Sequence, residues 1–261
     1  MKNNKSLNIK ILATLFFIGM VVVNALANIL PINGINTGAI SDSYPNLFAP
    51  AGVTFSIWGV IYLLLLIYVI YQFIPSSDVG EKEKKEKIFA YIGSYFIISS
   101  LANILWIFSW HYKLIPLTVL LIITILLSLI KIARYLDKQE LSSKEKFHIK
   151  LPFSIYFGWV TVATIANITI LLVSIGWGGW GIAPGVWTMI IIFVSAVIGL
   201  TRLIKDKDIA YGLVFIWAYY GIYLKHMTFF SLQYKGIIVS LLVYIILFTL
   251  AEGYILYRKY K

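Results

Sequence analysis

The stretch from Ala51 to Ile74, AGVTFSIWGVIYLLLLIYVIYQFI, contains no charged residue. The hydrocarbon core of a bilayer is about 30 Å thick, and about 20 consecutive apolar residues span it as a helix. Lipid offers no hydrogen-bond partner to a free backbone amide, so a segment that crosses the core in this way must be helical. The stretch therefore predicts a transmembrane helix, and with it an all-α membrane protein.

Seven further stretches have the same character. The eight predicted spans lie at residues 11–30, 51–74, 88–110, 115–136, 151–174, 184–204, 209–224 and 236–257. The seventh is the shortest and ends at Lys225. The composition agrees, because 60% of the 261 residues are hydrophobic and only 13% are charged, whereas soluble domains average about 25% charged residues. We therefore predict a polytopic helix bundle and exclude a soluble enzyme.

The basic residues predict how these spans are oriented. The formal net charge is +11, and with a cytoplasmic N-terminus every Lys and Arg except Lys113, Lys225 and Lys235 falls in an inside segment. Cytoplasmic loops carry this kind of excess. We expect a multi-pass protein of the inner or plasma membrane with both termini in the cytoplasm. We expect no nucleic-acid partner, because the charge is dispersed along the chain rather than gathered in a patch.

The N-terminal segment leaves one alternative open. Its lysines, the apolar run Ile11–Val23 and the sequence Ala25-Leu26-Ala27 together resemble a cleavable signal peptide. We favour a full span, because the apolar run continues to Leu30. Cleavage would leave seven spans without moving the other loops.

The connecting segments differ on the two sides of the membrane. On the inside, residues 75–87 and 137–149 carry mixed charges, and we expect solvated connectors there. On the outside, residues 31–50 are nearly uncharged and rich in Asn, Gly, Pro and Ser, and residues 175–185 are rich in Gly and Trp.

Polar chemistry has few places in this sequence. Cys is absent, and no set of His and carboxylates has metal-ligand spacing or the makings of a catalytic triad. We therefore assign no catalytic residue and no metal site. The three histidines, His111, His148 and His226, fall at or beyond predicted helix ends, where we expect them to be hydrated. Glu252 is the one carboxylate inside a predicted span, and we expect it to pair with Arg258 or to reach the interface.

Aromatic and amide side chains recur at helical spacing on three predicted spans. The sets are Trp58 and Tyr62; Asn103, Trp106 and Trp110; and Trp159, Ala163 and Asn167. Residues three or four apart share a helix face, so these faces would form an apolar pocket for a flat hydrophobic ligand if they converged. The alternative is that Trp side chains anchor the protein at the interface, which we favour for Trp177, Trp180 and Trp187. For Asn24 and Asn28 we favour hydrogen bonding between helices.

These residues give the sequence a resemblance to the TspO/MBR family, which comprises the tryptophan-rich sensory proteins and the peripheral-type benzodiazepine receptor. The resemblance covers about residues 10–175. Its motifs are Pro50, Gly52, Phe55, Trp58 and Tyr62 in the second helix, Asn103 and Trp106 in the third, and Trp159, Ala163 and Asn167 in the fifth. The chain departs from the family at Ser56-Ile57, where the family has a Pro, and in its eight-span length. The resemblance implies a five-helix membrane domain at residues 1–175 and three additional transmembrane helices at residues 176–261.

The resemblance also implies a function. Members of the family bind porphyrins and other tetrapyrroles, sterols and benzodiazepine-like compounds inside the bundle, under the loop that here spans residues 31–50. The ligand-binding candidates are Pro50, Phe55, Trp58, Tyr62, Asn103, Trp106, Trp110, Trp159, Ala163 and Asn167. We expect a porphyrin-like or haem-like ligand that is not covalently held, reached from the outer face, and a role as sensor, scavenger or facilitator.

Two other functions stay open at this point. One is a permease for a lipid or another hydrophobic compound, with the three additional helices as a moving element. The other is an enzyme, for example one that degrades porphyrin in light, although we favour a binding protein. The expected partners are membrane lipids and the hydrophobic ligand, with a homodimer as one option for the assembly.

Overall fold

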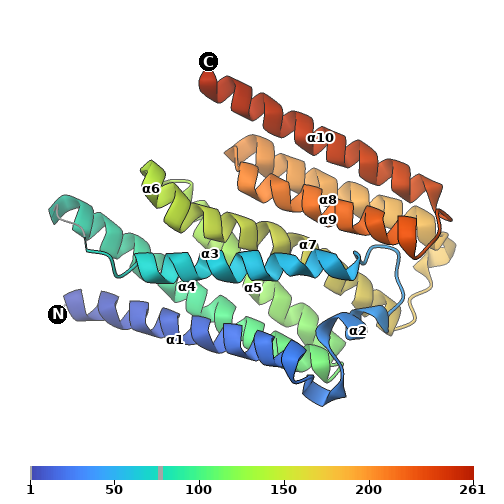
Figure 1. Ribbon diagram of the computed structural model, residues 1–261, viewed down its shortest axis with the longest axis horizontal. Helices are drawn as coiled ribbons and strands as arrows, with labels where there is room; N and C mark the ends of the chain where they lie inside the picture. The colour runs from blue at the N-terminus through green and yellow to red at the C-terminus, as the bar shows by residue number, and fades with distance from the viewer. Residues whose placement is uncertain (1, 76–78) are drawn as a thin grey trace. The chain divides into compact units, whose positions relative to one another are not determined.

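The computed structural model describes residues 2–75 and 79–261, and within these ranges it contains helices and no strands. A long helix lies at each of the eight predicted spans (Figure 1). These are α1 (Lys2–Ile29), α3 (Ile57–Tyr71), α4 (Val79–His111), α5 (Ile115–Leu136), α7 (Leu151–Ser174), α8 (Pro184–Asp206), α9 (Ile209–Thr228) and α10 (Lys235–Tyr260). The short elements are η1 (Ile32–Gly34), α2 (Thr37–Asp42), η2 (Gly52–Ser56), α6 (Ser143–Glu145), η3 (Lys146–Lys150) and η4 (Gly179–Gly181).

Among the described residues, seven helical segments are long and apolar enough to cross a membrane. They are Ser6–Ile29, Gly52–Tyr71, Gly80–His111, Ile115–Leu136, Ser143–Ser174, Pro184–Asp206 and Lys235–Lys259. The prediction of an all-α, polytopic membrane protein is confirmed. The eighth long helix, α9, is not among the seven, and it carries Lys225 and His226 in its last turn.

The chain forms two compact units. The first comprises Met1–Thr37 and Gly59–Tyr156, and the second comprises Gly38–Trp58 and Phe157–Lys261. Helices α3 and α7 therefore contribute residues to both units. These units do not follow the division expected from the resemblance, at residues 1–175 and 176–261, which stays a prediction.

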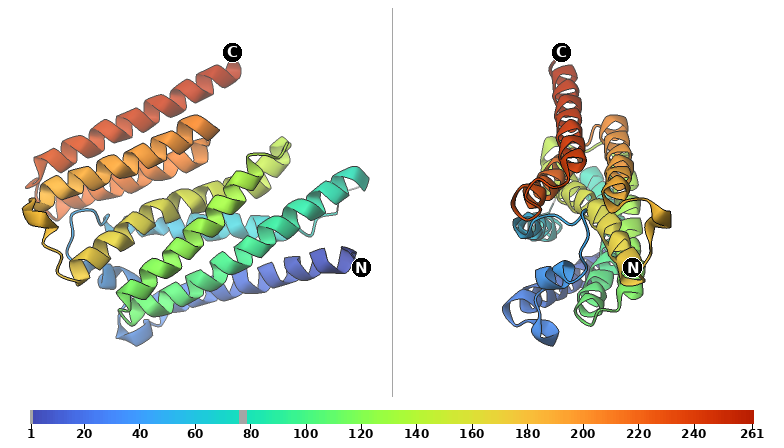
Figure 2. Two further views of the ribbon diagram at one scale, coloured as in Figure 1. Left: turned by 180° about the vertical axis from the view of Figure 1, so that it is seen from behind. Right: turned by 90° about the vertical axis from the view of Figure 1, so that its right-hand side faces the viewer.

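In the first unit, α1 packs along α4, and α4 packs along α5 (Figure 2). A largely buried ion pair joins the beginnings of α1 and α4. Lys10 Nζ lies 2.6 Å from Glu86 Oε1, and the Ser6 hydroxyl donates to the other carboxylate oxygen of Glu86. Three polar side chains near these helix ends therefore satisfy one another.

The segments expected to be solvated connectors are partly helical. Helix α4 already begins at Val79, and the ion pair between Glu83 and Lys87, at 2.9 Å, has the i, i+4 spacing that supports a helix. The part of that connector at residues 76–78 lies outside the described residues. In the second connector, a capping box formed by Ser142 and Glu145 starts a helical turn that leads into α7.

In the second unit, α8, α9 and α10 pack against one another (Figures 1 and 2). The helices approach closely at Gly199 of α8, where an added Cβ would lie 2.6 Å from the Phe248 ring and 2.7 Å from the Phe215 ring. Both rings are buried and stack on each other at a centroid distance of 5.3 Å. The absence of a side chain at Gly199 is therefore what allows this aromatic layer to form.

Glu252 lies one layer further along the same three helices. Its side chain packs over Gly212 of α9, where an added Cβ would lie 2.5 Å from Glu252 Oε1, and the residue is only 7% exposed. Arg258 lies over the Tyr254 ring instead. The expectation that Glu252 reaches the interface is wrong, because Gly212 opens a space for the carboxylate inside the packed helices.

The packing at Gly199 gives a prediction about stability. Changing Gly199→Ala should destabilise the protein by about 1–3 kcal/mol, because the new methyl group must displace two buried rings. Gly253→Ala on α10 is the matched control, since an added Cβ there meets nothing within 4 Å, and it should be neutral or mildly stabilising. Thermal unfolding in detergent measures both, and equal melting temperatures for the two variants would contradict the packing argument.

Candidate functional site

Three of the predicted ligand residues meet in the second unit. The rings of Phe55 and Trp58 each contact the Trp159 ring edge to face, at centroid distances of 6.0 and 6.4 Å. Trp159 is buried, and its indole Nε1 has no hydrogen-bond partner among the described residues. A buried donor that lacks an acceptor costs about 1–3 kcal/mol. The cluster therefore combines an aromatic surface with one donor that a ligand could satisfy.

The remaining predicted residues of the second unit lie close to this cluster in the chain. Ala163 and Asn167 follow Trp159 on the same face of α7, and Asn167 is buried. Pro50 is buried two residues before η2, the turn that carries Phe55.

In the first unit, Asn103 has a partner of its own. Its Oδ1 accepts a hydrogen bond of 2.7 Å from Asn24 Nδ2 on α1, and both side chains are buried. The expected role of Asn24 in bonding between helices is thus observed, and Asn103 shares it. The predicted residue Tyr62 belongs to the same unit, and its hydroxyl is buried.

Trp106 and Trp110 stack on each other near the end of α4, at a centroid distance of 5.1 Å. Trp110 Nε1 donates to the Thr37 carbonyl at 3.1 Å. The neighbouring His111 is fully buried, with Nδ1 2.9 Å from the Ile32 carbonyl and Nε2 3.1 Å from the Thr37 hydroxyl. The expectation of a hydrated His111 is wrong, because the ring binds the segment that follows α1.

The ten candidate residues are divided between the two units. Tyr62, Asn103, Trp106 and Trp110 belong to the first, and Pro50, Phe55, Trp58, Trp159, Ala163 and Asn167 belong to the second. The convergence of Trp58 with Trp159 is observed. The convergence of all three helix faces on one hollow stays a prediction.

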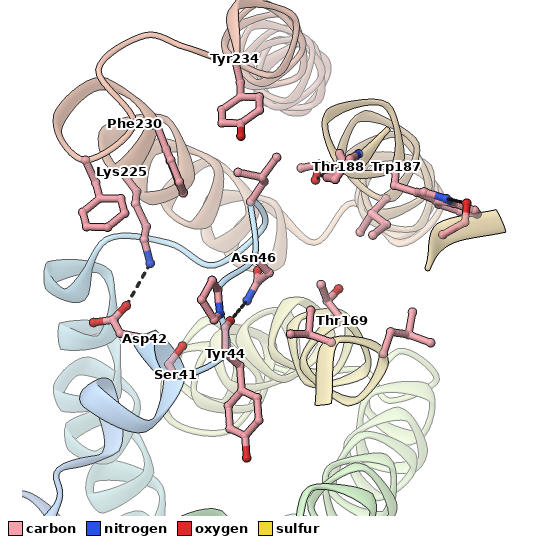
Figure 3. A pocket seen from close by; sticks show the side chains of 18 of the residues that line it. Ser41, Asp42, Tyr44, Asn46, Thr169, Trp187, Thr188, Lys225, Phe230 and Tyr234 are labelled. Carbon is pink, nitrogen blue, oxygen red and sulfur yellow. Dashed lines mark hydrogen bonds and ion pairs between the residues drawn. The ribbon is translucent and has the colours of Figure 1, made fainter. Parts of the chain in front are cut away.

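A cavity of about 860 Å³ lies entirely within the second unit (Figure 3). Three stretches of chain form it, at residues 41–52, 169–191 and 225–234. Its walls are mainly apolar and aromatic, with contributions from Tyr44, Leu47, Leu172, Val173, Trp177, Ile182, Trp187, Ile191, Phe229, Phe230 and Tyr234. None of the ten candidate residues lines it, although Phe55 and Asn167 lie within one helical turn of the lining residues Gly52 and Thr169.

The cavity contains a single pair of opposite charges among the described residues that line it. Lys225 Nζ lies 3.1 Å from Asp42 Oδ1, and the Lys225 side chain is 14% exposed whereas that of Asp42 is 70% exposed. Figure 3 shows this pair on one side of the cavity, with Thr169, Thr188 and Trp187 across from it. The positive charge is thus fixed in the wall, and its counter-ion reaches it from the solvent side.

Helix α9 holds the segment at residues 38–58 that borders the cavity. Trp217 Nε1 donates to the Thr54 carbonyl, and the Gly221 carbonyl accepts from the Ala51 amide, each at 2.9 Å. One turn later, His226 Nε2 donates to the Leu47 carbonyl at 2.9 Å.

Two further features of α9 complete this attachment. Thr54 packs directly against the backbone of Gly221. An added Cβ at Gly221 would collide with the Thr54 hydroxyl, at a distance of 2.0 Å. His226 is fully buried, so the expectation that it is hydrated is wrong for the same reason as at His111. The part of α9 from Trp217 to His226 therefore fixes the position of a segment whose own helical elements are short.

Sequence reasoning missed most of the residues that line the cavity. Trp177 and Trp187 were assigned to the membrane interface, which stays a prediction; in the structure both rings line the cavity, and Trp187 Nε1 donates to the Gly179 carbonyl at 2.6 Å. Trp180 is 81% exposed, and its expected place at the membrane interface stays a prediction. Lys225 had one distinguishing signal, since it is one of only three basic residues on the predicted outer side.

Comparison with models of protein families gives a match over most of the chain. The family model described as TSPO-like protein matches residues 10–254. The match thus extends beyond residues 10–175 and includes α8, α9 and most of α10. No curated protein and no solved structure matches the chain.

The contact between Asn24 and Asn103 predicts an energetic coupling. Asn24→Ala and Asn103→Ala should each destabilise the first unit, and a double-mutant cycle should give a coupling of about 0.6–1.7 kcal/mol, as for hydrogen bonds between other membrane helices. Denaturant unfolding in mixed micelles measures it. Asn28→Ala with Asn103→Ala is the control pair, because the Asn28 amide bonds to the Asn24 carbonyl within α1. Additive effects of the Asn24 and Asn103 changes would contradict the assigned role.

Proposed function

Because the chain belongs to the family of TSPO-like proteins, we propose that it is a membrane receptor for a flat hydrophobic small molecule, with tetrapyrroles such as porphyrins as the ligand class. The bound ligand would be sensed, scavenged or passed on. The observation that carries this proposal is the cavity of the second unit.

The size and lining of the cavity suit such a ligand. Small-molecule sites usually have volumes of about 300–1,000 Å³, with mainly apolar walls and a few polar groups, and this cavity has about 860 Å³. Trp, Tyr and Phe rings bury a large area and stack on other flat rings, and Trp177, Trp187 and Tyr234 line the cavity. Burial of the ligand against them would supply about 25 cal/mol per Å² of apolar area removed from water.

The cluster of Phe55, Trp58 and Trp159 is a second contact surface in the same unit. It supports the proposal because Trp159 Nε1 is a buried donor that lacks an acceptor among the described residues. An acceptor such as a ring nitrogen or a carbonyl on the ligand would satisfy this donor. We propose that the cluster lies beyond the cavity on the path of the ligand.

The resemblance implies a lid at residues 31–50, and we propose that the overlapping segment at residues 38–58 has this role. It borders the cavity through residues 41–52, and its helical elements are short. Connecting segments of this kind often carry binding residues in proteins. The distribution of basic residues supports a location of this end of the second unit outside the cytoplasm. We therefore propose access from the outer face in a plasma or inner membrane, with both termini inside.

Filling the cavity should block binding. Val173 lines the cavity, and Val173→Trp would occupy part of it, so the affinity for protoporphyrin should fall by about tenfold or more. Absorbance titration of the detergent-solubilised protein measures this. The control is Ile168→Trp, which adds the same side chain at an exposed position of α7 outside the cavity and should bind like the unchanged protein.

Three other outcomes of this experiment would change the proposal. Equal affinity of the two Trp variants would move the site away from the cavity. No binding by the unchanged protein would reject tetrapyrroles as ligands. Saturable flux of the porphyrin in proteoliposomes would replace the receptor with a permease, the alternative function.

The proposed orientation is testable because the sequence has no Cys. Gln233 and Glu140 are exposed residues, the first between α9 and α10 and the second between α5 and α6. In intact cells, a membrane-impermeant maleimide should label Gln233→Cys, whereas Glu140→Cys should react only after the cells are lysed. The reverse pattern would invert the topology and place the cavity on the cytoplasmic side.

A further inference from the structure

The charge pair in the cavity indicates what else the ligand carries. We infer that the ligand bears an anionic group, which replaces Asp42 as the partner of Lys225 and thereby frees the beginning of the lid segment. This inference rests on the proposed function of the cavity and narrows its ligand class to anionic amphiphiles. Three features of the second unit support it.

The first feature is that Lys225 keeps a favourable environment when Asp42 leaves. It lies in the last turn of α9, where the carbonyl ends of the helix favour a positive charge. Its Nζ also lies 5.9 Å from the centroid of the Phe229 ring, within the range of a cation–π contact. The cation is therefore held in the wall by α9 itself.

The second feature is the weakness of the existing partner. Asp42 is 70% exposed, and ion pairs with an exposed partner change an equilibrium by only a few-fold. A ligand carboxylate or phosphate seated inside the cavity would be shielded from water by the surrounding rings. Charge attraction is stronger in such a low-dielectric environment, so the ligand anion would exchange favourably with Asp42.

The third feature is the way the lid segment is attached. The Lys225–Asp42 pair joins the last residue of α2 to α9 through side chains, whereas Leu47, Ala51 and Thr54 are bound to α9 through their backbone groups. Loss of the ion pair would release Asp42 and leave these other bonds intact. Movement would then be confined to the chain before Leu47, so that occupation of the cavity is coupled to a local opening.

The test compares a porphyrin acid with its ester. Protoporphyrin and its dimethyl ester share the macrocycle and differ in the two carboxylates, so the unchanged protein should bind the acid about tenfold more tightly. Lys225→Gln should abolish this preference, and Lys225→Arg should retain it. Lys235→Gln is the matched control, because it removes an exposed charge near the cavity that does not line it.

A variant that gains affinity provides a control for misfolding, because an unfolded protein would lose affinity. Asp42→Asn removes the competing counter-ion, so it should raise the affinity for the acid several-fold and leave the affinity for the ester unchanged, a result that unfolding cannot imitate. An equal affinity of the unchanged protein for acid and ester, or an acid preference that persists in Lys225→Gln, would overturn the inference while leaving the receptor proposal in place.

A second probe pair separates the two proposals. If neither porphyrin binds, the tetrapyrrole proposal fails, and dansyl-undecanoic acid and its methyl ester then test the anion site alone. A preference for this acid that depends on Lys225 would support the inference, and the absence of such a preference would overturn the inference.

Repeating the titration in nanodiscs with and without phosphatidylglycerol identifies the source of the anion, because competition by that lipid would assign the site to a lipid head group rather than to a free amphiphile.

Discussion

The structure depends on the need to pair every backbone polar group that is kept from water. The long helices meet this requirement within themselves, but the segment at residues 38–58 contains only short helical elements and must find partners elsewhere. It finds them on α9, where Trp217, Gly221 and His226 bond to its backbone. The segment can therefore stay irregular and still be held in place.

This attachment also explains the character of α9. Its close contact with Thr54 requires Gly221, and its last turn carries Lys225 and His226. The three C-terminal helices thus have a structural role. Helices α8 and α10 pack against α9, and α9 positions the segment that borders the cavity.

The helices of this fold could be predicted from the sequence, and the cavity could not. Uninterrupted apolar runs indicate where a chain crosses lipid, so all eight long helices fall where the runs lie. The cavity arises where three stretches that are distant in the sequence come together. The periodicity of hydrophobic residues within one segment does not indicate such a contact between segments. Lys225 illustrates the difficulty, because in the sequence it looks like the polar end of a short helix, whereas in the fold it lines a cavity.

The aromatic and amide stripes were informative in part. The expected contact of Trp58 with Trp159 is observed. An amide buried among helices must find a partner, and Asn24 provides one for Asn103, whose expected place in a ligand pocket stays a prediction. His111 and His226 were expected in water because they stand at helix ends, yet both bind backbone carbonyls of neighbouring segments.

The attachment through carbonyls and amides has a consequence for the evolution of the chain. Backbone groups are the same for nearly every amino acid, so substitutions at Leu47, Ala51 or Thr54 that respect the available space leave their bonds to α9 intact. The side chains on α9 have less freedom, because the Trp217 indole and the His226 imidazole donate to those carbonyls and an added Cβ at Gly221 would collide with Thr54. Relatives that keep this architecture should diversify the border of the cavity, and hence its ligand preference, faster than the helix that supports it.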